Sequence, residues 1–288
     1  MSLTEELTFK LGDSGIVLNT DSVSIPFVDI DEVMGLDNAP YRETERDHEG
    51  TDGGFLDAEF EKGRPIVLQG TIYAASGAME SYLDTLKANY APSPSLVPFY
   101  YKAPGVAERM LLVKPQGCRY NWERMRRTGQ SPVQFRMYAE DSRIYDSFET
   151  VGSIPFATGA TTGFGFNLGF SFGFGAGGGG TDGAFLVNSG NRSTPLEFTI
   201  NGPCETPSIL DETYGHSLIF NIILALGETL VVNTQYKTVK LGGTLSRRNT
   251  LDEPDWFFLE SGSTFIRFRC ISGSAPSSLD YSFHSAWR

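Results

Sequence analysis

Two short motifs in the sequence have the residue types of loops that perform catalysis or bind phosphate. The first, "GDSG" at residues 12–15, matches the surroundings of the nucleophilic serine in trypsin-like proteases. In that family the catalytic histidine and aspartate come before the serine, and too little chain precedes Gly12 to supply them. Because Asp, Ser and Gly are also typical turn residues, we predict a turn between two strands here and no catalysis.

The second motif lies in "GFGFNLGFSFGFGAGGGG" at residues 163–180, where Gly175, Gly177 and Gly180 satisfy the pattern GxGxxG. A dinucleotide-binding loop also needs a strand before the glycines, a helix after them and an acidic residue about 20 positions further on. The residues that follow have no helical pattern, and no lysine follows the glycines as in a Walker-type loop. We therefore predict a flexible linker over residues 151–185, at the boundary between two domains.

Histidines and cysteines, the usual ligands of transition metals, number only three each and are widely dispersed. None has the CxxC, HxH or HExxH spacing of a zinc site, so we predict no metal centre and no cofactor. Carboxylates cluster at residues 29–32 and at Asp47, Glu49 and Asp52, without the spacing of an EF-hand loop. Solvated charged loops are the prediction, and a calcium site is the alternative that the sequence leaves open.

Two basic runs, at residues 120–127 and 246–248, contrast with a formal net charge of −12. An acidic chain is poorly suited to bind a phosphate backbone, so we expect no nucleic-acid partner. Basic patches often pair with acidic groups at subunit contacts, and Trp and Arg are favoured interface anchors. We predict an interfacial role for Trp122 and Arg124.

The elements that carry these residues are mostly strands. The 288 residues are 40% hydrophobic and 20% charged, which is typical of one large folded domain or two smaller ones. Residues 66–73 and 133–138 have strand patterns, and the apolar spacing over residues 78–90 predicts one amphipathic helix. We expect an N-terminal domain over residues 1–150.

The charged segment at residues 37–63 is too long for an ordinary connection, so we predict an arm that contacts a neighbouring subunit. A solvated surface loop is the alternative. The residues expected at the contact are charged side chains of both signs that lie close together in the sequence. They are Arg42, Glu43, Glu45 and Arg46.

The second half, residues 186–288, has seven strand-like segments at about ten-residue spacing, which is typical of an antiparallel β-sandwich. They lie within residues 195–201, 217–224, 228–233, 237–241, 255–260, 264–270 and 280–287. We expect bulky residues in these segments to fill the core. They are Phe198, Ile200, Phe220, Ile222, Leu230, Phe258, Ile266 and Phe268.

The N-terminus has no signal-peptide pattern, and no apolar run is long enough to span a membrane. We therefore expect no membrane insertion. The sparse cysteines indicate folding in a reducing cytoplasm.

Several segments resemble a known family. "RPIVLQGTIYA" (64–74) resembles a family strand with an arginine start and a central glycine, and "FRMYAEDSRIYDS" (135–147) resembles the segment that closes the family's N-terminal domain. "NSGNRSTPLEFTINGPCETPSI" (188–209) resembles the opening of its C-terminal domain, with an Asn-x-Gly start. "LGETLVVN", "WFFLESGSTFIRFRC" and the ending "SFHSAWR" resemble later family segments. On these segments the chain resembles the distal tail proteins of siphophages, also described as minor tail proteins.

The resemblance implies a mainly β fold, with an N-terminal split-barrel-like β domain that has one helix and a C-terminal galectin-like antiparallel β-sandwich. It also implies a structural, non-enzymatic protein of the phage tail tip, made in the cytoplasm of the host bacterium. Six copies would form a homo-hexamer ring that joins the tail tube protein to the tail-tip hub, or tail-associated protein, and that carries receptor-binding proteins.

Two other classes of function remain open at this point. One is a carbohydrate-binding adhesion module that contacts the host surface, for which the candidate sugar contacts are Trp256, Asp255 and Glu253. The other is an enzyme such as a glycosidase, which is the weakest hypothesis because histidines are scarce and no catalytic constellation is recognisable. A pair of catalytic carboxylates stays open, since such partners meet only in the fold.

Overall fold

A computed structural model gives the fold as two compact units. It describes residues 2–20, 24–42, 45–47, 50–52, 54–56, 60–75, 77–156, 163–164, 174–175, 182–274 and 276–288. The first unit spans Met1–Ser147 and includes Arg288, and the second spans Phe148–Trp287. Antiparallel strands dominate both units, so the predicted mainly β fold is confirmed.

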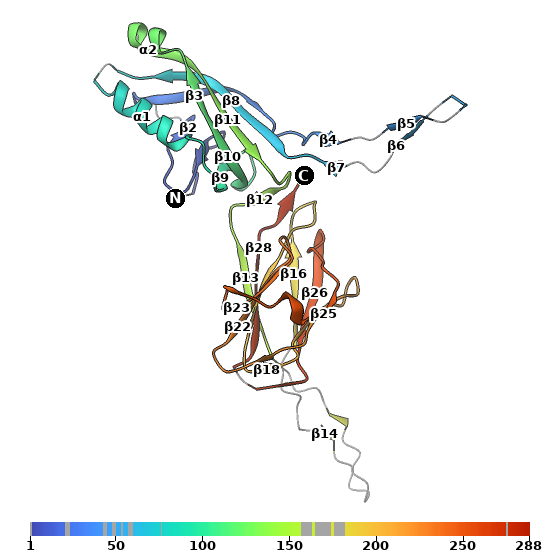
Figure 1. Ribbon diagram of the computed structural model, residues 1–288. Coiled ribbons are helices and arrows are strands. Elements are labelled where there is room, and N and C mark those ends of the chain that lie inside the picture. The colour runs from blue at the N-terminus through green and yellow to red at the C-terminus, as the bar shows by residue number, and fades with distance from the viewer. Residues whose placement is uncertain are drawn as a thin grey trace, which may run out of the picture. The chain divides into compact units, whose positions relative to one another are not determined.

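The first unit is built on an antiparallel sheet with the strand order β2-β1-β9-β10-β11-β8-β3, and β12 pairs with β10 (Figure 1). The strands are β1 (Phe9–Leu11), β2 (Val17–Leu18), β3 (Phe27–Met34), β8 (Arg64–Tyr73), β9 (Val97–Tyr101), β10 (Arg109–Tyr120), β11 (Gln130–Ala139) and β12 (Ile144–Asp146). Alternate residues of β8 and β11 are buried, as the period-two pattern of these segments predicts.

Asn19 joins the two ends of this sheet. Its backbone N–H donates to the Val28 carbonyl at 2.9 Å, and its side-chain oxygen accepts from the Ile30 N–H at 3.0 Å. Its side-chain amide also donates to the Leu7 carbonyl at 2.9 Å. Asn19 follows β2, and both of its partners on the far side lie on β3. The sheet therefore curls until its ends meet, and an asparagine closes the seam in place of a strand ladder.

Two helices lie in the described part of the first unit, so the prediction of a single helix is wrong. Helix α1 (Met79–Asn89) is the predicted one, with Leu83 and Leu86 buried. Helix α2 (Trp122–Thr128) was missed. The Asn121 side chain caps α2 by accepting from the Arg124 N–H at 3.0 Å, and Gly129 ends it with a φ of 67°.

The charged segment between β3 and β8 forms an arm of short antiparallel pairs. Strand β4 (Tyr41–Arg42) pairs with β7 (Phe60–Glu61), and β5 (Glu45–Asp47) pairs with β6 (Gly54–Leu56). The arm runs away from the sheet of the first unit (Figure 1). The ordered pairs agree with an arm better than with an irregular surface loop.

The second unit has two main antiparallel sheets, and a third, shorter one pairs in the order β21-β18-β27. The first main sheet has the order β13-β28-β17-β22-β23-β24, and the second has the order β16-β26-β19-β20-β25. The first main sheet consists of β13 (Thr150–Pro155), β28 (Ser278–Phe283), β17 (Glu197–Asn201), β22 (Thr229–Asn233), β23 (Thr238–Leu241) and β24 (Leu245–Ser246). The second consists of β16 (Gly183–Asn188), β26 (Gly262–Arg269), β19 (Ser208–Asp211), β20 (His216–Phe220) and β25 (Leu251–Pro254). Other elements of the second unit are β21 (Ile223–Leu224), β18 (Cys204–Glu205), β27 (Ser272–Gly273), β29 (Ala286–Trp287) and a 3-10 turn at Arg248–Thr250.

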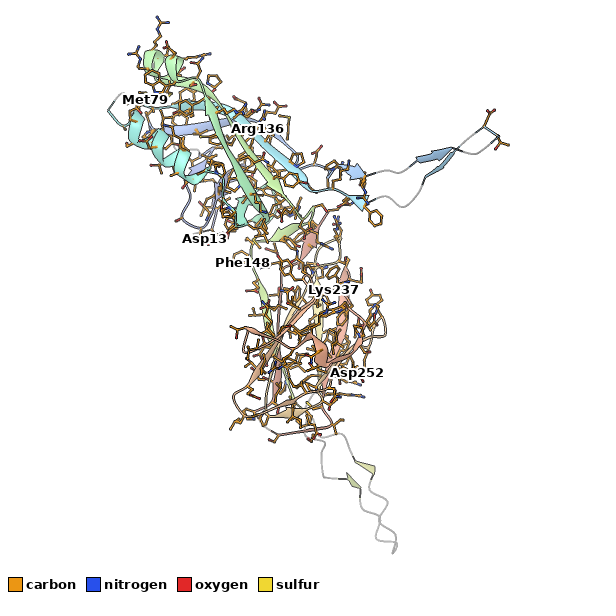
Figure 2. All side chains as sticks on the ribbon, in the orientation of Figure 1. Asp13, Met79, Arg136, Phe148, Lys237 and Asp252 are labelled. Atoms are coloured by element: carbon orange, nitrogen blue, oxygen red, sulfur yellow. The ribbon has the colours of Figure 1, made fainter. Side chains whose placement is uncertain are left out.

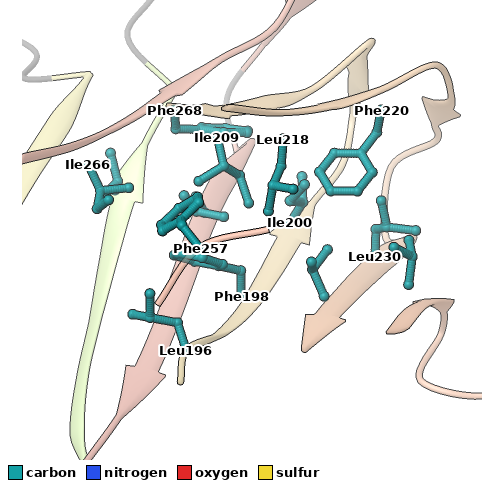
Figure 3. Close-up of a cluster of buried hydrophobic side chains, with 14 of the residues drawn as sticks. Leu196, Phe198, Ile200, Ile209, Leu218, Phe220, Leu230, Phe257, Ile266 and Phe268 are labelled. Carbon is teal, nitrogen blue, oxygen red and sulfur yellow. The ribbon is translucent and has the colours of Figure 1, made fainter. Parts of the chain in front are cut away.

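Side chains from both main sheets fill a shared core, as Figure 3 shows. Six of the predicted core residues are buried, while Ile222 only packs against the core and Phe258 is half-buried. The core position belongs to Phe257 instead. The strand predicted at residues 255–260 is also wrong: β25 ends at Pro254, and Leu259 makes only an isolated bridge to Thr194.

The predicted linker over residues 151–185 differs from the structure at both ends. Residues 151–155 lie in β13, which pairs with β28, and residues 183–185 lie in β16, which pairs with β26. Ile154 and Leu186 are buried in the sandwich core, which explains why these flanking segments fold with it. The Gly/Phe-rich stretch is thus an insertion within the second unit, where β14 (Gly163–Phe164) pairs with β15 (Phe174–Gly175). Residues 177–180, which we expect to be mobile, lie outside the described residues.

Candidate assembly surfaces

The arginine that starts the first family-like motif supports the inside of the first unit. Arg64 is fully buried. Its guanidinium donates to the Leu36 carbonyl at 3.1 Å, to the Gly35 carbonyl at 3.3 Å and to the Ser142 carbonyl at 2.9 Å. The planar guanidinium of arginine has several N–H donors, so it can bond the Leu36 carbonyl and the Ser142 carbonyl at the same time. The motif arginine is therefore a structural residue.

The central glycine of the same motif lies opposite an irregularity in β3. Gly70 pairs with Ile30, and the register shifts between Ile30 and Glu32, which leaves Asp31 as the bulged residue. A Cβ atom at Gly70 would lie 1.9 Å from the Asp29 carbonyl oxygen. The bulge brings the two backbones together, and only glycine permits that approach.

The segment that closes the first unit is held by a network around Asp141. The Asp141 carboxylate accepts from the Arg143 backbone N–H at 3.0 Å, from its guanidinium at 3.2 Å and from the Tyr145 hydroxyl at 2.6 Å. Burial and the Asp141 charge raise the pKa of Tyr145 above its ordinary value, so this hydroxyl stays protonated and keeps donating. The network shapes the turn after β11 in which Ser142 meets Arg64.

Asn188, the last residue of β16, holds a turn in the second unit through a similar network. Its buried side-chain amide donates to the Arg192 carbonyl at 2.7 Å and accepts from the N–H groups of Gly190 and Ala286 at 3.1 and 3.2 Å. A Cβ atom at Gly190 would lie 1.7 Å from the Ala286 carbonyl oxygen. The Asn-x-Gly start therefore closes a tight turn against the end of the chain.

The "GDSG" motif forms a turn, as predicted. Gly12 has a φ of 76°, and its carbonyl accepts from the Gly15 N–H at 3.3 Å between the paired strands β1 and β2. Asp13 accepts from the Tyr100 hydroxyl at 2.7 Å. The residues of this motif are thus explained by local folding.

Among the described residues, no group of three or more His, Cys, Asp or Glu side chains is arranged to hold a metal ion. The acidic run at residues 29–32 lies along β3 with its carboxylates exposed. No helix within the described ranges is long and apolar enough to cross a membrane.

The three candidate sugar contacts lie on β25 and just after it. Asp255 is engaged with His216, whose Nδ1 lies 2.9 Å from Asp255 Oδ2. Trp256 is half-buried against the sandwich core, and its buried indole N–H has no hydrogen-bond partner in the described part of the chain. Glu253 lies on β25. Because Trp256 packs against the sandwich core and its indole N–H is buried, this geometry does not support the sugar site, which stays a prediction.

The candidate interface residues lie in two places of the first unit. Trp122 and Arg124 share helix α2, where Trp122 is 47% exposed and the Arg126 guanidinium lies 5.5 Å from its ring centre. Arg42 lies at the base of the arm, 5.9 Å from the ring centre of Phe60. Figure 2 shows nitrogen-tipped side chains projecting from α2.

The other arm candidates are less fully described. Glu45 and Arg46 lie on β5, and Glu43 lies outside the described residues. Arg126 and Arg127 were not among the predicted interface residues, although both belong to the basic run at residues 120–127 and are exposed. The high density of arginines in that run was the sequence feature that could have identified them as interface candidates.

Comparison with known proteins defines the class of the second unit. Residues 189–287 match the sequence model of a family described as "Siphovirus-type tail component, C-terminal domain". The search of curated proteins found no match. The crystal structure of Dit from phage SPP1, described as "a Paradigm of Hub Adsorption Apparatus in Gram-positive Infecting Phages", matches with a TM-score of 0.65 and 13% identity over 99% of this chain and 100% of that chain. A chain of the phage P2 baseplate in its activated conformation with Ca matches with a TM-score of 0.49 and 11% identity, over 96% of this chain and 97% of that chain.

Within the second unit, residues 189–287 are thus similar to the C-terminal domain of siphovirus-type tail components. The fold of the chain is that of SPP1 Dit, and the resemblance to siphophage distal tail proteins is confirmed.

Proposed function

We propose that this protein is a structural distal tail protein of a long-tailed bacteriophage. Its copies form a ring, a hexamer, that joins the tail tube to the tail-tip hub and to the host-adhesion apparatus of the virion. The observation that carries this proposal is the match of residues 189–287 to a siphovirus-type tail component domain. The fold likeness to SPP1 Dit, which extends over 99% of the chain, supports it for the first unit as well.

The arm supports an assembled state. It consists of two-stranded pairs, and a two-stranded pair is marginally stable alone in water. Its base exposes Phe60 at 60%, with Arg42 above the ring. A neighbouring subunit would supply the surface that stabilises such an element, so we place the contacts of Arg42, Glu43, Glu45 and Arg46 on the next copy of the ring.

The mass of the full-length protein in solution tests the proposal. One chain has a mass of 31.6 kDa, so a ring of six has six times that mass, about 190 kDa. Light scattering behind a sizing column gives the mass, and electron micrographs show whether the particles are rings. A protein that stays monomeric at every concentration contradicts the ring.

A further inference from the structure

The end of the sheet around α2 carries a concentrated positive charge. We define the α2 patch as four exposed arginines that flank or belong to this helix. They are Arg119, Arg124, Arg126 and Arg127. No ion pair joins any of them to an acidic side chain in the part of the chain that the structure describes. In a chain with a net charge of −12, unpaired clustered arginines are available to a partner of opposite charge.

The α2 patch also has the composition of an interface anchor. Trp122 is 47% exposed, and the Arg126 guanidinium covers its ring at 5.5 Å. Trp and Arg are the residue types most enriched among energetically dominant interface residues. Because Asn121 and Gly129 fix both ends of α2, these side chains are presented on a short, well-capped helix.

A complementary surface lies on β3 of the same unit. We define the β3 acidic edge as Asp29, Asp31 and Glu32, all exposed. These carboxylates form no ion pair with a basic side chain within the described ranges, and Glu32 accepts only a neutral bond from Gln69 at 3.1 Å. Asn19 already bonds the Val28 carbonyl and the Ile30 N–H of β3, and the bulge at Asp31 and the charges further disfavour the addition of another strand to this edge. A partner must therefore meet it through side chains.

We propose that the α2 patch of one subunit docks on the β3 acidic edge of the next subunit, a contact that rests on the ring of the proposed function. The α2 patch repels its own copy, which disfavours a two-fold contact of α2 with α2. Two different complementary surfaces on one chain give a head-to-tail contact, and head-to-tail contacts generate rings when the rotation closes. In this contact the partner is a second copy of the same chain, and the attraction between opposite charges stabilises it.

Charge reversal in the full-length protein tests the contact. One variant carries Arg124→Glu, Arg126→Glu and Arg127→Glu, and a second carries Asp29→Lys, Asp31→Lys and Glu32→Lys. Each turns attraction into repulsion at every contact, so the concentration for half-assembly should rise roughly tenfold or more, because single exposed pairs are weak but several act together. The control variant Lys240→Glu with Arg248→Glu reverses exposed charges on the second unit and should assemble like the wild type.

The decisive measurement is whether ring assembly recovers when the two sets of charge reversals are combined. The chain that carries both sets of reversals has complementary surfaces again and should form rings at nearly the wild-type concentration. An equimolar mixture of the two single-surface variants should also reassemble, in rings where the variants alternate. Circular dichroism and urea unfolding check that each variant is folded, and recovery in the mixture cannot come from misfolded chains.

The outcomes separate this contact from the ring itself. If the wild type never assembles, the ring fails and the contact fails with it. If the wild type forms rings and either reversal leaves them unchanged, or if the combined chain and the mixture both fail to recover, the contact alone is overturned. If the α2 reversal instead abolishes binding of a fluorescent double-stranded DNA while rings persist, the α2 patch serves nucleic acid and the proposal is wrong.

Discussion

Arg64 supplies the donors for the buried Ser142 carbonyl and for the half-buried Leu36 carbonyl of the first unit. Replacing it with methionine keeps much of the apolar stem but leaves the Leu36 and Ser142 carbonyls without this donor. An unsatisfied buried acceptor costs about 1–3 kcal/mol and a half-buried one less, so we expect Arg64→Met to lower the free energy of unfolding by roughly 2 kcal/mol or more. Urea unfolding measures this loss.

The matched control for Arg64 is Arg136, an exposed arginine on β11 whose Nε donates to the Gln134 side chain at 2.9 Å. Arg136→Met should change the unfolding free energy by less than about 0.5 kcal/mol, as is usual for surface substitutions. Equal losses in the two variants would show that burial of the guanidinium does not matter.

Gly70 is the second residue on which the first unit depends. The Cβ of Gly70→Ala would lie 1.9 Å from the Asp29 carbonyl oxygen, so the β3 bulge must move. Overpacking of this kind costs about 1–3 kcal/mol, measured as a lower midpoint of urea unfolding. Gly77→Ala is the control, because no atom outside Gly77 and its two chain neighbours lies within 4 Å of its added Cβ. A Gly70→Ala variant as stable as Gly77→Ala would contradict the close approach.

Single residues also show where pattern analysis of the sequence reaches its limit. Strict alternation places Phe198 and Ile200 in the core correctly. In "DWFFLE" three large apolar residues follow the tryptophan without a break, so alternation permits two registers. The choice of Phe257 over Phe258 depends on the bridge between Leu259 and Thr194, a partner far away in the sequence. Such a register is set by tertiary pairing and not by local pattern.

At the scale of elements, the arm can be removed without opening the sheet. The Lys62 N–H donates to the Pro40 carbonyl at 2.7 Å, so the two chain ends left by deleting residues 41–61 are adjacent. An Asn-Gly turn can join them. We expect this variant to fold with wild-type secondary structure by circular dichroism and to lose the proposed ring, because we propose that the arm contacts a neighbouring subunit. Light scattering gives its mass, and wild-type rings without the arm would show that the arm is ordinary surface.

Helices and strands differ in how well they can be predicted from the sequence. Helix α1 is long enough for its apolar spacing to show, and the segments of β8 and β11 alternate along their length. Helix α2 has seven residues, too few for a periodic face, and only the capping types of Asn121 and Gly129 mark it. The α2 patch was therefore visible as composition, while its place on a capped helix and its relation to the β3 acidic edge required the fold.

At the scale of the whole molecule, the second unit should fold independently when its true bounds are used. A fragment with the bounds that the sequence predicts for the sandwich, residues 186–288, lacks β13 and begins inside β16. It loses Ile154 from the core and exposes the edge of β28 that β13 covers. Burial of one large aliphatic side chain contributes about 1.5–3 kcal/mol, and an uncovered edge promotes association.

We therefore expect the fragment of residues 148–287 to unfold cooperatively in urea and to be more stable than residues 186–288 by at least about 2 kcal/mol. A third fragment, with residues 157–181 of the longer one replaced by a Gly/Ser linker, keeps β13 and β16 and isolates the effect of the insertion. It should retain the stability of the longer fragment, because the core side chains all remain. If the shortest fragment is as stable as the longest, β13 is not an integral strand of the sandwich. If the linker-replaced fragment alone is destabilised, the insertion itself contributes to the fold.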